Sequence, residues 1–535
     1  MIDVLVIGSG GAGLSAALTA KKEGASVLVA GKSYPTTSQT CMAQGGMNAA
    51  LGNTEEDHIA LHIEDTVKSA HGICNEHMVR KMCSDAPGAI AWLEELGVPF
   101  SRLDNGKGGT ASVAQRQMGG ASAKRACYAQ DYTGLKILHT LYDNCLKEEI
   151  DFLNEYFLLN LVTEENTVKG ATFLDIRCGE VVQVDAKSVI IATGGFGALY
   201  HGHTTNAFGS TGDGVAAALR AGGAVSDMEF VQFHPTALKS SAILISEAAR
   251  GEGGYLLNSE NKRFVDELKP RDEVARAIFT EFEQGREVFL DVRHLGEEKL
   301  MELLPQEVEL CRLHEHVDPV TELIPIKPVA HYTMGGIDAD DALEVNGIKG
   351  FFAVGECSSA KIHGANRLGG NSLLEIITFG KFAGENACKH AMFAKSTPAD
   401  DTQLQKDKAH IAHIYAQEHS ISFYEARERL GGLFYDKVGI VRDNDLLNEA
   451  LEEVINMQIS LPKMGIEDQA KEHNQNLVEF LEFSNALLLA PTVISSAIAR
   501  DESRGAHFKK GFEFEEDERF KKHIVLQWNR EKAQR

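Results

Sequence analysis

The apolar residues of the chain gather into short runs that end on glycines. Residues 2–7 (IDVLVI) are almost continuously apolar, which is typical of a strand covered on both faces of a parallel sheet. Three glycines in GxGxxG spacing follow, then an Ala-rich segment that predicts a helix. A second apolar run at 25–29 completes a β-α-β unit. This order of strand, glycines and helix predicts a dinucleotide-binding fold at the N-terminus.

Each glycine of this first turn has a predicted task. Gly8 lets the chain turn sharply, Gly10 lets the backbone approach a pyrophosphate, and Gly13 lets helix and strand pack closely. The helix predicted to begin near Gly11 directs its free N–H groups and positive dipole end at that phosphate. Where a nicotinamide-binding fold has an acidic ribose ligand, the second strand runs on to Lys32. The missing ligand weakens the nicotinamide interpretation.

The same pattern returns far along the chain. A strand near 186–192 ends on glycines, and Asp213 stands in the first turn of a predicted helix. Segment 236–345 is more charged and has fewer small residues, whereas strand, glycines and small-residue helix reappear from 351 to 387. The predicted fold class is therefore α/β, with the organisation that follows: a Rossmann-type dinucleotide-binding domain made of two chain segments (1–235 and 346–395), an inserted domain (236–345) and a C-terminal helical domain (396–535).

Other segments carry local predictions. We expect a polar loop over 33–52 that leads into a small-residue helix, and a glycine-rich loop over 105–134. The uncharged stretch 484–499 contains a proline and falls short of the roughly 20 residues that a bilayer requires, so it is predicted to be a core helix. The charged segment from 512 onward is predicted to pack late or to contact a partner.

Composition excludes several classes. Lys plus Arg total 53 against 77 for Asp plus Glu, a net charge of −24, which argues against nucleic acid and against an anionic membrane face. The nine cysteines include no CxxC pair, so we expect no iron-sulfur or zinc cluster of the usual spacing and no metal. Scattered thiols and no leader before the first strand predict a cytoplasmic protein.

Several short clusters of His, Arg and Glu stand among glycines. Glu247 and Arg250 are three residues apart, which places both on one face of a helix. His234 follows an apolar run, Arg271 leads into a predicted helix, and His331 is expected in a loop. Taken singly, such residues are more often solvated ion pairs or satisfied core histidines. Together they suit a dicarboxylate, which needs several fixed donors, and a hydride transfer, which needs a proton donor and a relay.

At these motifs the chain resembles the flavoprotein subunit of the succinate dehydrogenase and fumarate reductase family, from residue 2 to residue 507. The motifs that carry the resemblance are GSGGAG (8–13), AQGG (43–46), TGDG (211–214), FHPT (233–236), RGEGG (250–254), PRD (270–272), AHYTMGG (330–336), GECSS (355–359) and HGANRL (363–368). The resemblance implies an FAD-binding domain, a capping domain formed by the inserted segment, and an active site between the two.

The resemblance also implies residue roles. Arg271 is similar to the family's proton donor, with Glu247 and Arg250 as its relay. The implied ligands of the two substrate carboxylates are His234 with Ser246, and His331 with Arg367. The implied FAD contacts are Gly8, Gly10, Gly11, Gly13, Lys32, Ser38, Gln39, Thr40, Gly45, Gly46, Asp213, Glu356, Ser372 and Leu373.

Two positions depart from the family pattern. The family's loop reads Ser-His-Thr, with the histidine bonded covalently to the flavin, whereas this chain has Gln39 there. An amide cannot form that bond, so we expect noncovalent FAD, a lower flavin potential and a preference for fumarate reduction. Met118 stands where an aromatic residue commonly precedes two glycines, which leaves open whether substrate packing or preference is altered there.

Two alternatives stay open. L-aspartate oxidase shares the fold, lacks the covalent histidine and would form iminoaspartate, but it commonly has cysteine where this chain has Met334. A flavin-binding electron carrier without dicarboxylate chemistry is the other alternative, disfavoured by the complete set of His, Arg and Glu positions. As a member of the resembled family, the chain would serve electron transport in anaerobic respiration. The expected partners are fumarate or succinate and a separate iron-sulfur subunit, with a membrane-anchor or thiol/disulfide-linked subunit that would make it peripheral at a membrane.

Overall fold

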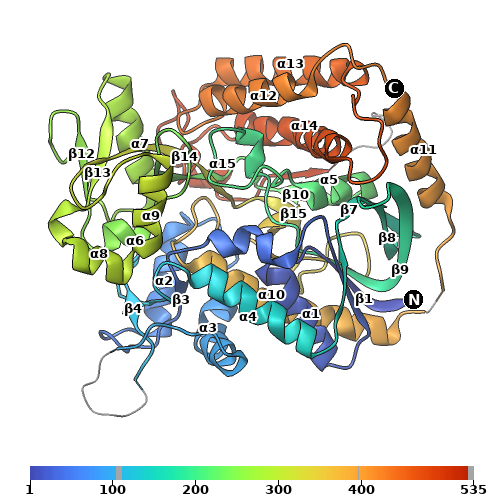
Figure 1. The fold of residues 1–535 in the computed structure, drawn as a ribbon, viewed down its shortest axis with the longest axis horizontal. Coiled ribbons are helices and arrows are strands. Elements are labelled where there is room, and N and C mark those ends of the chain that lie inside the picture. The colour runs from blue at the N-terminus through green and yellow to red at the C-terminus, as the bar shows by residue number, and fades with distance from the viewer. Residues whose placement is uncertain (104–110, 396, 528–535) are drawn as a thin grey trace.

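The computed structural model describes residues 1–103, 111–395 and 397–527 (Figure 1). Part of the predicted glycine-rich loop over 105–134 lies outside these residues. The central seven-stranded sheet has the order β6-β2-β1-β9-β8-β7, with β16 also paired to β9. Its strands are β1 (Ile2–Ile7), β2 (Val27–Gly31), β6 (Asp151–Asn154), β7 (Tyr156–Glu164), β8 (Thr167–Asp175), β9 (Glu180–Ile191) and β16 (Phe351–Ala353). The α/β class is as predicted.

Strands from both predicted segments meet in this sheet. β6, β2, β1, β9 and β16 run parallel, whereas β7, β8 and β9 form an antiparallel meander. Because β16 follows the inserted segment in sequence and pairs with β9, the sheet is completed only by the second segment. Apolar residues at 2–7 face buried surroundings from Val4 onward, which fits a parallel strand covered on both faces.

Five helices pack together beside the sheet, of which the first and the last lie directly against its strands. They are α1 (Gly11–Lys22), α2 (Ile59–Ser69), α3 (Glu76–Leu96), α4 (Thr133–Lys147) and α10 (Asn371–Phe393). α1 and α10 lie side by side because glycines face the neighbouring backbone: a Cβ on Gly384 would stand 2.4 Å from the carbonyl oxygen of Ala16. In place of the expected small-residue helix after residue 33, two 3-10 turns (Pro35–Thr37, Gln39–Met42) lead to the small sheet β3 (Met47–Asn48), β5 (Ala126–Cys127) and β4 (Gln115–Arg116).

A second small sheet contains the C-terminal segment. It has the order β17-β15-β10-β18 and follows α5 (Asp213–Ala221), with β10 at Ala224–Ser226, β15 at Gly336–Asp338, β17 at Ser358–Ser359 and β18 at Val525–Gln527. The short α15 (Asp517–Phe520) precedes β18. The charged segment beyond 512, predicted to pack late or to contact a partner, thus adds an edge strand to this chain's own sheet at β10.

The inserted segment forms an α+β unit at one end of the molecule, coloured yellow-green in Figure 1. Its sheet has the order β11-β14-β13-β12. The elements are β11 (Val231–Leu238), α6 (Glu247–Gly251), β12 (Tyr255–Asn258), α7 (Arg271–Glu283), β13 (Val288–Asp291), α8 (Glu297–Leu303), α9 (Pro305–His314) and β14 (Ile324–Thr333). His331, expected in a loop, is in strand β14, because its neighbours pair with β11. The exact domain boundaries stay a prediction.

The C-terminal part is helical, and its helices lie along the top and the right of the molecule in Figure 1. It contains α11 (Thr402–Ala416), α12 (Phe423–Lys437), α13 (Asn444–Ser460) and α14 (Gln475–Ala499). Helix α14 has 25 residues, so the argument that it is too short to span a bilayer was wrong. By length and composition it qualifies as a span, but 72% of its most apolar window is buried inside the protein. It is a core helix, as predicted, for that reason.

Candidate active site

The glycine turn between β1 and α1 has the geometry that its sequence predicts. A Cβ on Gly13 would stand 1.9 Å from the carbonyl oxygen of Gly8, so only glycine lets helix and strand approach here. Gly8 itself has φ of +112°, and a Cβ there would meet the carbonyl oxygen of Ala192 at 2.2 Å. Gly10 is the N-cap of α1 and lines a cavity. The turn therefore presents backbone N–H groups and the positive end of α1 to that cavity.

One cavity of about 550 Å³ collects nearly all predicted site residues. Its size is within the usual range for a cofactor or substrate site. The predicted residues in its wall are Gly8, Gly10, Gly11, Lys32, Ser38, Gln39, Thr40, Gly45, Gly46, Asp213, His234, Ser246, Glu247, Arg271, His331, Glu356, Arg367, Ser372 and Leu373. Gly13 and Arg250 are not in the wall: Gly13 packs against Gly8, and Arg250 lies behind Glu247.

At one end of the cavity, Lys32 is held by two carboxylates. Its Nζ lies 2.6 Å from Asp213 Oδ2 and 2.6 Å from Glu482 Oε1. Burial alone would lower the pKa of Lys32, but Asp213 and Glu482 raise it above its ordinary value. Asn485 Nδ2 donates to Asp213 Oδ1 at 2.9 Å. Helix α14 therefore closes the end of the cavity next to β2, where a ribose ligand was missing from the sequence.

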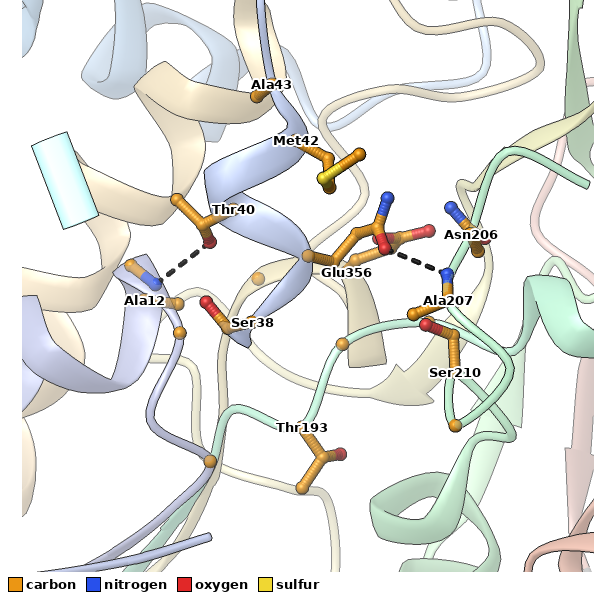
Figure 2. A pocket seen from close by; sticks show the side chains of 18 of the residues that line it. Ala12, Ser38, Thr40, Met42, Ala43, Thr193, Asn206, Ala207, Ser210 and Glu356 are labelled. Atoms are coloured by element: carbon orange, nitrogen blue, oxygen red, sulfur yellow. Dashed lines mark hydrogen bonds between the residues drawn. The ribbon is translucent and has the colours of Figure 1, made fainter. Parts of the chain in front are cut away.

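The loop that contains Gln39 crosses the cavity. Gly11 N donates to Thr40 Oγ1 at 3.0 Å, which joins this loop to the start of α1. Gln39 Oε1 accepts from Ala207 N at 3.0 Å. Figure 2 shows Ser38 and Thr40 on one side of the cavity and Ser210 and Asn206 on the other. The buried hydroxyl of Ser38 has no hydrogen-bond partner in the part of the chain that the structure describes.

Other buried polar atoms in the wall also have no hydrogen-bond partner among residues 1–103, 111–395 and 397–527. They are Thr193 Oγ1, Gln44 Oε1, Asn206 Oδ1 and Arg367 Nε. Buried polar groups are nearly always hydrogen-bonded in native structures. Orphaned donors and acceptors on opposite walls of one cavity, together with an open glycine turn, fit a large polar cofactor that bonds along its length.

Glu356 stands in the cavity wall between β16 and α10. Its Oε1 accepts from Thr333 N at 3.0 Å and from Thr333 Oγ1 at 3.3 Å. Burial raises the pKa of Glu356 to about 7, against the lowering effect of the Thr333 backbone bond and of Arg367. Ser372 and Leu373 line the cavity at the start of α10.

At the cap side, three predicted catalytic residues form a chain. Arg271 Nη2 and Nε lie 2.7 and 2.9 Å from Glu247 Oε2. Arg250 Nη2 lies 3.7 Å from Glu247 Oε1, and Gly119 N donates to that same oxygen at 2.8 Å. Burial would raise the pKa of Glu247, but Arg271 and Arg250 hold it below its usual value. An ionised carboxylate therefore bridges two buried guanidiniums.

The predicted carboxylate ligands surround the same space. His234 and His331 have ring centroids 4.9 Å apart. Burial and the nearby Arg271 lower the pKa of both rings well below the ordinary value, so both are neutral near pH 7. Arg367 lies over the Tyr332 ring at 4.3 Å, and burial together with Arg271 lowers its pKa to about 10. Ser246 Oγ accepts from Ala248 N at 2.9 Å and caps α6.

The local charge is positive. Arg250 and Arg271 both face the ionised Glu247, and Arg367, which shares Gln232 Oε1 with Arg271, adds a third buried guanidinium. Buried guanidinium groups that outnumber their carboxylate partners cost folding free energy unless a bound anion pairs with them. The site therefore suits a dianion with two separated carboxylates.

Sequence reasoning missed three residues that organise the site. Gln232 Oε1 accepts from both Arg271 (3.0 Å) and Arg367 (3.1 Å). Glu307, on α9, accepts from Ser246 N at 3.1 Å. Glu482 binds Lys32. Gln232 could have been predicted from the sequence, because residues two apart on one strand share a face and Gln232 is two residues before His234. Glu307 and Glu482 have no such signal in their local sequence.

Two family models match the chain. Residues 3–373 match the family model described as FAD binding domain, and residues 427–535 match the one described as Fumarate reductase flavoprotein C-term. The 8-methylmenaquinol:fumarate reductase flavoprotein subunit of Wolinella succinogenes is 40% identical over 98% of this chain and 88% of its own length.

Solved structures give the same result. A flavoprotein of Escherichia coli quinol fumarate reductase carrying a Glu-to-Gln substitution has a TM-score of 0.93 at 35% identity, covering 99% of this chain and 95% of that one. A quinol-fumarate reductase with menaquinol molecules has a TM-score of 0.92 at 36% identity, covering 98% and 95%.

Proposed function

Because the chain belongs to the fumarate reductase and succinate dehydrogenase flavoprotein family and is an FAD-dependent oxidoreductase, we propose that it interconverts fumarate and succinate, favouring fumarate reduction. The observation that carries the proposal is the buried chain Arg271, Glu247 and Arg250 beside His234 and the cavity. A proton relay and a set of carboxylate ligands around one cavity are the two protein contributions that this reaction needs.

FAD supplies the hydride-transfer chemistry when bound. The glycine turn at Gly8 and Gly10 would hold its pyrophosphate, and Lys32 with Asp213 would hold the nucleotide end. The unpartnered hydroxyl of Ser38 is among the donors that would bond the cofactor along the cavity.

Arg271 would give the proton to the substrate carbon. A free guanidinium has a pKa above 12 and is a poor acid, so the proton must be restored at once. Glu247 touches Arg271 at 2.7 Å, so a proton can pass between these two residues. Arg250 Nη2 lies 3.7 Å from the other oxygen of Glu247, so this ion pair must shorten before the proton passes on to Arg250. Gln232 Oε1 holds Arg271 Nη1 at 3.0 Å and so fixes the direction of the guanidinium.

The substrate carboxylates would be held on two sides. Arg367 offers its guanidinium, and its unpartnered Nε is free to donate. His331 and His234 add ring nitrogens, and Ser246 adds a hydroxyl. Two ionised carboxylates would balance the positive charge of the site, which explains a preference for a dianion over a monoanion.

We further propose that FAD is held without a covalent bond. Gln39 stands where the family has the linking histidine, and its amide is hydrogen-bonded to Ala207 N. Acid precipitation tests this: flavin is expected in the supernatant, and flavin that remains with the pellet would contradict it. A noncovalent flavin has a lower potential than a covalent one, which supports fumarate reduction as the favoured direction.

The electron partner would be a separate iron-sulfur subunit. The chain has no CxxC pair of its own. One relative is named as the flavoprotein subunit of an 8-methylmenaquinol:fumarate reductase, and one similar solved structure is a quinol-fumarate reductase. Such a partner, with a membrane-anchor or thiol-linked subunit, would make this protein peripheral at a membrane.

The test is turnover of the isolated chain with a low-potential dye. Reduced dye should be oxidised by fumarate, and succinate should reduce oxidised dye more slowly. Arg271→Gln should lower turnover by about 10²- to 10⁴-fold. The control is Arg263→Gln, an exposed arginine of the cap that pairs with Glu267 and should keep full turnover. Release of oxaloacetate and ammonia from L-aspartate, with no fumarate turnover, would contradict the proposal.

A further inference from the structure

A hydrogen bond joins the substrate histidine of β14 to the segment that follows the second glycine turn. Thr205 Oγ1 lies 2.7 Å from His331 Nδ1. Both residues line the cavity. Thr205 has no assigned role in the reaction proposed above.

The backbone on both sides of this bond is fixed. Thr205 N donates to Ala330 O at 3.0 Å, and Thr204 Oγ1 donates to the same oxygen at 2.9 Å. Asn206 Nδ2 donates to His331 O at 3.0 Å. These bonds hold residues 204–206 against β14. The backbone therefore keeps the hydroxyl of Thr205 next to His331 Nδ1.

Gln39 supports the segment from the other side. Its Oε1 accepts from Ala207 N at 3.0 Å. The loop that in the resembled family carries the covalent flavin is therefore tied here, by a hydrogen bond, to the segment that orients the substrate histidine. The flavin side and the substrate side of the cavity share this support.

The chemistry of the ring decides what Thr205 does. A neutral imidazole carries one N–H, and the partner of one nitrogen selects which nitrogen holds it. A substrate carboxylate only accepts, so the nitrogen that faces it must carry hydrogen. A hydroxyl can donate as well as accept, so Thr205 can donate to Nδ1 and leave the hydrogen on Nε2.

The neighbouring histidine has no partner that selects one tautomer. His234 Nδ1 lies 3.0 Å from the carbonyl oxygen of Thr236, which accepts, and 3.3 Å from the backbone nitrogen of Thr236, which donates. The hydroxyl of Thr236 lies 3.4 Å from the same nitrogen but donates to the carbonyl oxygen of Ile245 at 2.8 Å. The short contact with a hydroxyl at 2.7 Å therefore distinguishes His331 from His234.

We propose that Thr205 is a positioning residue for the dicarboxylate: its hydroxyl donates to His331 Nδ1, which holds the Nε2–H tautomer that binds a substrate carboxylate. The inference rests on the proposed function. It adds a specificity-determining residue to that site, outside the set of side chains expected to touch the substrate.

The experiment compares Thr205→Val, which keeps the shape and removes the hydroxyl, with Thr205→Ser, which keeps the hydroxyl. Malonate binding to the FAD-loaded protein is measured from the change in flavin absorbance, and fumarate turnover is measured with reduced dye. Thr205→Val should weaken malonate binding and raise KM for fumarate by about 10- to 100-fold, the worth of one hydrogen bond to a charged group, with kcat changed far less. Thr205→Ser should restore both within about threefold.

A double-mutant cycle separates positioning from general damage. If Thr205 acts through His331, then adding Thr205→Val to His331→Ala should weaken malonate binding by less than about threefold. Thr19→Val is the control, since Thr19 is a buried threonine outside the cavity wall whose hydroxyl donates to Ser15 O within α1. Thr205→Ala serves as the second apolar variant if Thr205→Val does not retain FAD.

The outcomes are distinct. Unchanged malonate binding in both apolar variants, an equal loss in Thr205→Ser, or full additivity with His331→Ala would each overturn the role of Thr205. A parent protein that neither binds malonate nor reduces fumarate would instead overturn the proposed function.

Discussion

The ion cluster of Lys32, Asp213 and Glu482 gives the sharpest stability prediction. Lys32→Met removes the ammonium group that contacts both Asp213 and Glu482, whose side chains are 8% and 9% exposed. Breaking a buried pair typically costs about 3–5 kcal/mol, because the remaining charge has lost its partner. Lys32 is itself 27% exposed at the cavity, so we expect the lower end, about 3 kcal/mol.

A matched surface pair provides the control. Lys187 is 22% exposed, close to Lys32, and its Nζ lies 2.7 Å from Asp3 Oδ1. Asp3 is 28% exposed, so water solvates it when the lysine is removed. Lys187→Met should therefore cost at most about 1 kcal/mol. The difference between the two variants isolates the burial of the carboxylates.

The loss in Lys32→Met should depend on pH. Burial raises the pKa of Glu482 even though Lys32 opposes the rise, and removing Lys32 raises it further. A carboxyl group whose pKa is higher in the folded protein than in the unfolded chain lowers the stability of the folded state only at pH values at which the unfolded chain ionises it. Because the unfolded chain is the same in both proteins, the deficit of the variant should be smallest below the folded-state pKa of Glu482 in the parent. It should grow, by at most about 1.4 kcal/mol per pH unit, as the pH rises from that pKa toward the higher pKa of Glu482 in the variant.

The assay is urea unfolding followed by far-UV circular dichroism, from pH 4 to pH 8. Excess FAD at two concentrations separates cofactor affinity from intrinsic stability, because ligand binding stabilises in proportion to the logarithm of its concentration. The double variant Lys32→Met with Glu482→Gln should recover part of the loss. A deficit equal to that of Lys187→Met, or one that does not change with pH, would refute the reasoning.

Two further predictions concern the glycine turn and the cap. Gly13→Ala places a Cβ 1.9 Å from the carbonyl oxygen of Gly8, so α1 must move away from β1. We expect the purified variant to lose bound FAD and to have a lower Tm. A variant that keeps its full FAD content would contradict the close-packing role of Gly13. Glu307→Gln tests the capping domain. Burial and the nearby Asp131 raise the pKa of Glu307 to about 8, although Arg116 opposes the rise. The contribution of Glu307 to the free energy of unfolding should therefore decrease as the pH rises from about 4.5 to about 8. The Gln variant should lack this slope, about 1.4 kcal/mol per pH unit, in unfolding measured across that range; parallel pH profiles count against it.

Local sequence predicted the parts of the site whose geometry is local. Strand β1, the turn at Gly8 and helix α1 follow from apolar continuity and glycine spacing, because backbone conformation over about twenty residues depends mainly on nearby residues. Glu247 and Arg250 share a helix face at the predicted spacing. His331 was misplaced in a loop because the flanking glycines outweighed its strand pattern.

The sequence by itself determined that this chain has a dinucleotide turn, two separated pieces of one sheet, and a set of His, Arg and Glu motifs typical of a dicarboxylate flavoenzyme. Only the tertiary structure decided the partners: Glu482 with Lys32 across 450 positions, Glu307 with Ser246, and Thr205 with His331. The physical reason is that motif spacing governs local backbone geometry, whereas ion pairs, burial and ring tautomers depend on packing between distant segments.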